Sequence, residues 1–346
     1  MLNKRILLDI VKNKIKKGDK MCTVAVWADN GVAVLSGRTL DWKTDMATNL
    51  WQLPRGVERH GLSGGQANSL NWQSKYGSVV SMAYDISTAD GINEKGFAAH
   101  ILWLVESDYG VNSPDKKGIS VGMWAQFMLD NFATVNEAVE YWQKKDIQLV
   151  TKMVPQMNVL PTVHLLIEDS SGDVAVIEYI DGKANIYHGK QYRVMTNSPS
   201  YSEQLTNLKR YKGFGGEDNL PGSTQAADRY VRAAYYLEKL IKPDNPTIAI
   251  AEMMSVMRSV AEPFSEFDPS LPNVSPTRWF TICDHTNGVY FYQNTLSPYP
   301  VWINYKKIDF DSLKVARKLD MVSNPDRIGD NTDNFVDNIE PNWALV

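Results

Sequence analysis

The chain has 346 residues, of which 43% are hydrophobic and 22% are charged. This composition is typical of a folded globular protein, and it excludes a disordered, collagen-like or disulfide-dense chain. A net charge of −4 argues against a nucleic-acid partner, which would need a basic surface. No run of about 18 apolar residues occurs in the sequence, so we expect no stable insertion into a membrane.

Residues 1–20 carry seven Lys or Arg and only two Asp. Asp9 interrupts their apolar run, and no small-residue cleavage site precedes Cys22, so the segment does not have the pattern of an ordinary signal peptide. We expect residues 1–21 to be a leader or propeptide that is removed, with translation from Met21 as the alternative. The compartment stays undetermined, and the cytoplasm is favoured over the periplasm.

The first predicted element is a β-hairpin. Residues 23–28 and 32–37 are rich in β-forming side chains, and Asn30-Gly31 lies between them. Asn and Gly tolerate the positive φ angles of a type I′ turn, so the hairpin places Cys22 at its start. Similar patterns predict a meander over residues 163–186 and a hairpin from 279–283 and 289–293.

Helices are predicted between these strands. They cover residues 123–131, a segment up to residue 142 after the capping box Thr134-x-x-Glu137, residues 225–241, and a segment that starts near Pro246. This order indicates an α+β fold with antiparallel sheets rather than alternating β-α-β units. We expect one domain over residues 22–346, with the Asp- and Asn-rich tail from Ser323 on its surface.

The histidines do not suggest a metal site. The five of them are scattered, with no HxxxH pattern and no cysteine pair beside them. We therefore predict neither a metal nor an organic cofactor.

Cys22 is the main candidate for chemistry, since the chain has only one other cysteine. A free cysteine is more often a small buried apolar residue. If the preceding residues are removed, however, Cys22 gains an α-amino group with a pKa of about 7.7–8.0. That amine could act as the general base for its own thiol, so nucleophile and base would share one residue.

Arg38 and Asp41 follow the return strand of the predicted hairpin and can lie beside Cys22. A cation there would favour the thiolate, and a carboxylate could orient the α-amine. The alternative for both residues is an ion pair on the surface.

Five short motifs, in this order, resemble the choloylglycine hydrolase family of linear amide C–N hydrolases, which includes bile salt hydrolases and penicillin V acylases. They are Cys22-Thr23, Gly37-Arg38-Thr39-Leu40-Asp41-Trp42, Asp90-Gly91-Ile92-Asn93-Glu94-Lys95-Gly96, Thr196-Asn197-Ser198-Pro199, and Leu220-Pro221-Gly222 followed by Asp228-Arg229-Tyr230.

The resemblance implies an N-terminal-nucleophile (Ntn) hydrolase with a four-layer αββα sandwich of two antiparallel sheets. It assigns Cys22 as the nucleophile, with Arg38 and Asp41 beside the thiol and the α-amine. It assigns Asn197 to the oxyanion hole and Arg229 as a second active-site arginine. Without it, Asn197 would be interpreted as a turn residue and Arg229 as an exposed helix charge.

Trp103 falls where many bile salt hydrolases have Asn. The resemblance implies that its backbone N–H is the second oxyanion donor and that its side chain lines the acyl pocket, although core packing is an equal alternative. Trp42 would form a second pocket wall, as in the Gram-negative branch of the family. Two indoles favour a flat aromatic or aliphatic acyl group over a steroid.

These residues predict an amidase that forms a thioester acyl-enzyme and resembles penicillin V or acyl-homoserine-lactone acylases. The alternatives are a bile salt hydrolase, an inactive binding protein of the same fold, and a cysteine protease with a Cys–His pair. The expected partners are a small-molecule amide and further copies of the chain in a homo-oligomer such as a tetramer.

Overall fold

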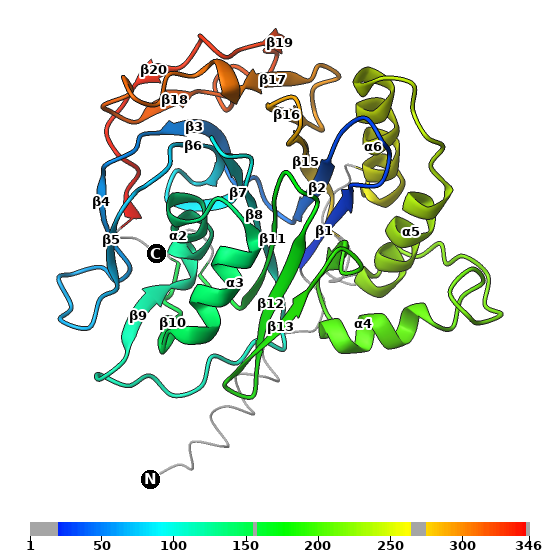
Figure 1. Cartoon of the computed structure of the whole chain (residues 1–346), viewed down its shortest axis with the longest axis horizontal. Coiled ribbons are helices and arrows are strands. Elements are labelled where there is room, and N and C mark those ends of the chain that lie inside the picture. Colours follow the sequence, from blue (N-terminus) through cyan, green and yellow to red (C-terminus); the bar gives the residue numbers. More distant parts are fainter. Residues whose placement is uncertain (1–19, 155–157, 264–274, 344–346) are drawn as a thin grey trace.

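The computed structural model describes residues 20–154, 158–263 and 275–343. Two large β-sheets lie face to face, and helices cover the outer face of each sheet (Figure 1). This is the expected αββα sandwich of an α+β protein. None of the helices in the described ranges is long and apolar enough to cross a membrane.

The first sheet has the strand order β14-β1-β2-β15-β16-β17-β19, and only its edge pair β17–β19 is parallel. Its strands are β1 (Lys20–Trp27), β2 (Leu35–Trp42), β14 (Val194–Thr196), β15 (Thr277–Asp284), β16 (Val289–Asn294), β17 (Val301–Asn304) and β19 (Gly329–Asp330).

The second sheet is antiparallel throughout, in the order β13-β12-β11-β8-β7-β6-β3-β18-β20. Its strands are β3 (Asn49–Leu53), β6 (Ser78–Ala83), β7 (Ser87–Asn93), β8 (Ala98–Trp103), β11 (Val163–Glu168), β12 (Val174–Ile180), β13 (Lys183–His188), β18 (Arg317–Leu319) and β20 (Val336–Asp337). Two small sheets add β4 (Glu58–His60) with β5 (Asn71–Gln73), and β9 (Lys117–Ser120) with β10 (Ile147–Val150).

Helices α5 (Ala226–Lys239) and α6 (Pro246–Val260) pack on the first sheet, and α4 (Tyr201–Leu208) packs on α5. Helices α2 (Trp124–Asn131) and α3 (Val135–Lys144) pack on the second sheet, and two 3₁₀ turns complete the elements, η1 (Val121–Met123) and η2 (Tyr305–Lys307). The capping box predicted before α3 is present, since Thr134 and Glu137 exchange hydrogen bonds with each other's backbone. Every residue of β2 is buried, because helix α6 covers one face of the strand and the second sheet covers the other.

The predicted hairpin is present, but its return strand begins at Leu35 rather than at residue 32. The Asn30 side chain accepts hydrogen bonds from the backbone N–H groups of Val32 and Ala33. Val34 donates its N–H to the Thr286 hydroxyl instead of to β1. The local bonds of Asn30, together with the distant bond to Thr286, replace the two-residue turn with a longer connection.

The tail after Ser323 is not a simple surface segment. It supplies β19 to the edge of the first sheet and β20 to the edge of the second. Asn331 and Phe335 are buried there. Strand pairing, which the tail's polar composition does not reveal, decides its position.

Candidate active site

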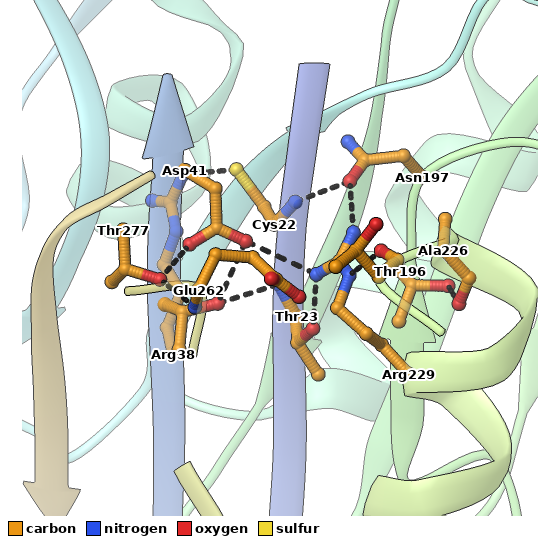
Figure 2. A network of polar contacts seen from close by, with 12 residues as sticks. Cys22, Thr23, Arg38, Asp41, Thr196, Asn197, Ala226, Arg229, Glu262 and Thr277 are labelled. Carbon is orange, nitrogen blue, oxygen red and sulfur yellow. Dashed lines mark hydrogen bonds and ion pairs between the residues drawn. The ribbon is translucent and has the colours of Figure 1, made fainter. Parts of the chain in front are cut away.

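Strand pairing brings Cys22, Arg38 and Asp41 together. Cys22 pairs with Leu40 across β1 and β2, so Arg38 and Asp41 lie within two residues of its partner. The three side chains are almost fully buried, with exposed fractions of 6%, 1% and 0%. Figure 2 shows them on neighbouring strands, with the sulfur between Arg38 and Asn197.

Arg38 is held by several contacts at once. Its Nη2 lies 4.0 Å from the Cys22 sulfur and donates to the Ile101 carbonyl at 2.8 Å. Its Nη1 donates to the Ala89 carbonyl and lies 3.5 Å from Asp90. The guanidinium also lies over the Trp279 ring, 5.0 Å from its centre. These contacts fix a positive charge beside the thiol.

Burial raises the pKa of the Cys22 thiol, and the positive charge of Arg38 acts in the opposite direction without overcoming it. Asp41 also raises this pKa through its negative charge, while its backbone N–H lowers it. In this state, with Met21 still joined to Cys22, the sulfur is therefore protonated at neutral pH. Arg38 favours the thiolate, but its charge alone is insufficient.

Asp41 and Arg229 form a buried ion pair. Arg229 Nη1 lies 3.1 Å from Asp41 Oδ2, and both side chains are inaccessible to solvent. Thr277 donates to the other carboxylate oxygen of Asp41 at 2.6 Å, and Arg229 also donates to the Thr23 hydroxyl at 2.6 Å. Burial raises the pKa of Asp41 to about 7, although Arg229 and Thr277 oppose this rise.

Asn197 contacts both Cys22 and Arg229 (Figure 2). Its side-chain oxygen accepts a hydrogen bond from the backbone N–H of Cys22 and lies 3.3 Å from Arg229 Nη2. Its side-chain nitrogen donates to the Trp103 carbonyl at 2.7 Å. Arg229 therefore does not lie on the surface, and Asn197 is not merely a turn residue.

The backbone of Trp103 also faces Asn197. Leu104 donates its N–H to the carbonyl of Thr162, the residue just before β11. Successive N–H groups along a strand point to opposite sides, so the N–H of Trp103 points away from β11. The N–H and C=O of one strand residue share a side, and the Trp103 carbonyl already bonds to Asn197. The N–H therefore points toward the same side as the Asn197 amide.

A largely apolar pocket opens beside the thiol. Cys22 and Arg38 contribute polar groups, and Trp42 and Trp103 form a wall in which their ring centres lie 5.7 Å apart. Further apolar side chains line the pocket, namely Leu40, Met46, Ala83, Ile86, Val121 and Val154. Such a pocket fits a flat or flexible apolar group.

Several site residues had little or no signal in the sequence. Thr23 and Asp90 lie inside the motifs quoted above, but nothing in those motifs distinguished them. Thr277 and Glu262 follow no motif at all, yet the Thr277 hydroxyl bonds both the Asp41 carboxylate and the Glu262 backbone N–H. Such residues can be found only once β15 is known to lie beside β2.

Comparison with known proteins finds relatives over most of the chain. The family model described as linear amide C–N hydrolases, choloylglycine hydrolase family, matches residues 22–317. Penicillin V acylase of Pectobacterium atrosepticum is 44% identical over 89% of this chain and 87% of its own length. The bile salt hydrolase/transferase of Clostridium perfringens is 27% identical over 70% of this chain and 79% of its own.

Solved structures agree with this relationship. Penicillin V acylase from Agrobacterium tumefaciens superimposes with a TM-score of 0.83 at 43% identity, over 93% of this chain and 99% of its own. A conjugated bile acid hydrolase variant from Clostridium perfringens has the same fold, with a TM-score of 0.73 at 22% identity over 86% and 97% of the two chains. The protein is therefore a member of the choloylglycine hydrolase family, a hydrolase of carbon–nitrogen bonds in linear, non-peptide amides.

Proposed function

We propose that the protein hydrolyses small N-acyl amides with an aromatic or aliphatic acyl group, with penicillin V as the representative substrate. The observation that carries this proposal is the position of Cys22 against an apolar pocket with Trp42 and Trp103 in its wall. Two relatives with more than 40% identity are penicillin V acylases, which supports the same choice.

Cys22 is the nucleophile in this proposal, and residues 1–21 are removed to free its α-amine. Residues 1–19 lie outside the described ranges, whereas Cys22 lies within them. Its nitrogen already contacts Asn197 as a backbone N–H. After cleavage, the same nitrogen becomes an amine next to its own thiol and can accept the thiol proton.

The thiolate then attacks the substrate carbonyl carbon and forms a carbon–sulfur bond, which places a negative charge on the carbonyl oxygen. The side-chain amide of Asn197 and the backbone N–H of Trp103 face one side of the site and stabilise this oxyanion. Arg38 and Arg229 supply positive potential, and Asp41 holds Arg229 and orients the amine.

Collapse of the intermediate breaks the carbon–nitrogen bond, and the ammonium of Cys22 gives its proton to the leaving amine. The acyl group remains on sulfur as a thioester. Water attacks the thioester with the α-amine as base, and the acid leaves as the thiol reforms. All of these steps use groups of the chain and water.

The direct test is the hydrolysis of penicillin V, a long-chain acyl-homoserine lactone and glycocholate by the purified protein. We expect the first two to be cleaved faster than glycocholate, because the indole wall favours flat or flexible chains over a steroid. The variant Cys22→Ser should lose most turnover, whereas Cys283→Ser should retain it. Preferential cleavage of glycocholate would instead make the protein a bile salt hydrolase.

Intact mass tests the maturation step. We expect the active chain to begin at Cys22 and to behave as one domain over residues 22–346. An active preparation that still carries residues 1–21 would refute the proposed base. Substrate binding by such a chain without turnover would identify a binding protein instead.

We also propose that the chain forms a homo-oligomer such as a tetramer. Several large apolar side chains are exposed on the described part of the chain and could be covered by a second copy, namely Ile241, Leu296, Ile328 and Ile339. Light scattering coupled to gel filtration measures the assembly mass, and a monomer at micromolar concentration would contradict this expectation.

A further inference from the structure

A row of four buried charged side chains runs from the active site into the space between the sheets. Arg38 lies 3.5 Å from Asp90, Asp90 bonds to His100 Nδ1, and His100 Nε2 lies 2.7 Å from Glu168. Arg38 belongs to β2 of the first sheet, and the other three residues belong to β7, β8 and β11 of the second. None of the four is more than 1% exposed.

The contacts of His100 require a positive charge. A neutral imidazole has only one N–H donor, yet each ring nitrogen of His100 faces a carboxylate oxygen. Only the imidazolium donates to both. Burial alone would lower the pKa of His100, but Glu168 and Asp90 raise it to about 10. The four charges therefore alternate in sign and balance.

Further groups contact both carboxylates. Tyr290 donates its hydroxyl to Asp90 Oδ1 at 2.5 Å, and Thr281 lies 3.3 Å from the same oxygen. His285 Nε2 lies 3.5 Å from Glu168 and 3.2 Å from Ser36 Oγ. The row is thus a connected network rather than an isolated buried charge, and within the described residues only Glu168 Oε2 and Arg38 Nε of the row are buried without a hydrogen-bond partner.

The same residues shape the socket that holds Arg38. Asp90 and His100 form the last pair of the β7–β8 ladder. Beyond that pair, Arg38 donates to the carbonyls of Ala89 and Ile101, the next residue on each strand. The guanidinium therefore takes the place that the next pair of backbone hydrogen bonds between β7 and β8 would occupy.

A β-bulge in β7 sets the direction of the Ala89 carbonyl. On the other edge of β7, Ser81 pairs with Asp90 and Met82 pairs with Thr88, so Ala89 is the extra residue. Bulges near active sites redirect backbone groups in this way. The Asp90–His100 bond lies immediately beside the bulge and ties β7 to β8 at that point.

We propose that His100 is a positioning residue for amide hydrolysis, which together with Asp90 and Glu168 clamps Arg38 in place beside the Cys22 sulfur. The inference rests on the proposed role of Cys22 as nucleophile. His100 is not a base for the thiol, because both of its nitrogens bond to carboxylates and the Asp90 side chain links it to Arg38. Its substitution should act through the position of Arg38.

The decisive variant is His100→Gln/Glu168→Gln, which removes one positive and one negative charge and leaves Arg38 and Asp90 balanced. We expect native circular dichroism and normal maturation by intact mass. We expect kcat for the best panel substrate to fall about tenfold to a hundredfold, with little change in KM, because displacement of a catalytic group by about 1 Å has effects of this size.

Alkylation of Cys22 by iodoacetamide across pH supplies a readout that does not need turnover. A displaced Arg38 should raise the apparent thiol pKa by about one unit, and so slow alkylation about tenfold at pH values below that pKa. The matched control is His188→Gln/Asp173→Asn, which removes another His–carboxylate pair, 2.7 Å apart, between β13 and the residue just before β12. This control should leave both readouts unchanged.

Unchanged kcat and unchanged alkylation in a folded, mature His100→Gln/Glu168→Gln variant would overturn the proposal. If that variant does not fold, Tyr290→Phe replaces it, since it removes one donor to Asp90 and keeps all four charges. A fall of about twofold or more in both kcat and the alkylation rate supports the proposal. If either of the two stays unchanged, the proposal is refuted. If the wild type cleaves no amide, the proposed function fails, while alkylation still reports the position of Arg38.

Discussion

The side-chain oxygen of Asn197 accepts a hydrogen bond from the backbone N–H of Cys22, which lies 175 residues earlier in the chain. The contact exists because β14 and β1 are neighbours at the edge of the first sheet, where Thr23 pairs with Thr196. It fixes the amide of Asn197 next to the nitrogen that maturation would convert to an amine.

Asn197→Ala should lower kcat by about a hundredfold to a thousandfold, the range measured when one oxyanion donor is removed elsewhere. KM should change little, because the donor acts mainly on the transition state. Steady-state kinetics with penicillin V measures both constants. Asn219→Ala, at an exposed asparagine that contacts Lys212, is the control. An unchanged kcat for Asn197→Ala would remove this residue from the oxyanion hole.

Trp42→Leu should lower kcat/KM for penicillin V about tenfold, since the phenoxy ring loses an aromatic wall worth on the order of 1 kcal/mol in addition to its apolar area. The loss for an aliphatic acyl-homoserine lactone should be smaller. Trp302→Leu, which contacts Phe291 outside the pocket, should leave both substrates unaffected. Equal losses for both substrates would mean that Trp42 supports the fold rather than the ring.

The pKa of Asp41 makes stability depend on pH. Its folded value of about 7 lies above the ordinary value of about 3.9, so between these pH values the folded state holds a proton that the unfolded state has lost. The proton on Asp41 stabilises the folded state fully below about pH 4, and this stabilisation is lost as the pH rises through 7. The variant Asp41→Asn has no such proton.

The free energy of unfolding of the wild type should therefore decrease relative to that of Asp41→Asn between pH 5 and pH 8. Urea titrations at several pH values measure this difference, with intact mass used to match the N-termini of the two proteins. A difference that stays constant over this range would show that Asp41 keeps its charge throughout, held by Arg229.

Gly91→Ala should destabilise the fold by about 1–3 kcal/mol, the usual effect of overpacking a core. A Cβ on Gly91 would lie 2.6 Å from a methyl group of Val80 and 2.8 Å from the Val79 carbonyl. Because Gly91 follows Asp90, the variant should also lower kcat. Gly222→Ala, where the Cβ has open space, should change stability by less than about 0.5 kcal/mol. Chemical denaturation compares the two, and equal stabilities would contradict the packing argument.

The clamp on Arg38 changes how a histidine scan should be interpreted. Loss of activity at one of the five histidines would ordinarily suggest a Cys–His protease. Here His100 bonds to Asp90 and Glu168 with its two ring nitrogens, so an effect of its substitution fits a positioning role equally well. Loss of activity or a shifted thiol pKa does not by itself identify a base, because the histidine of a Cys–His pair also lowers the thiol pKa. The contacts of His100 argue against such a pair, since both of its ring nitrogens bond to carboxylates.

Local patterns in the sequence were sufficient for the hairpin after Cys22, the capped start of α3 and the proline start of α6, because each depends on residues close together in the chain. The proximity of Cys22, Arg38 and Asp41 follows from the same hairpin. The predicted start of the return strand at residue 32 was wrong. Val34 donates its N–H to the hydroxyl of Thr286, which is far away in the sequence.

The sequence by itself thus determined several of the strands and helices, the family resemblance and the candidate nucleophile with its nearest charges. Only the tertiary structure decided that Arg229 is buried against Asp41 and that Trp42 and Trp103 share one wall. It also decided that His100 lies between Asp90 and Glu168. The physical reason is that these contacts join strands and helices far apart in the chain, where sheet order and burial, rather than local propensity, set which charges meet.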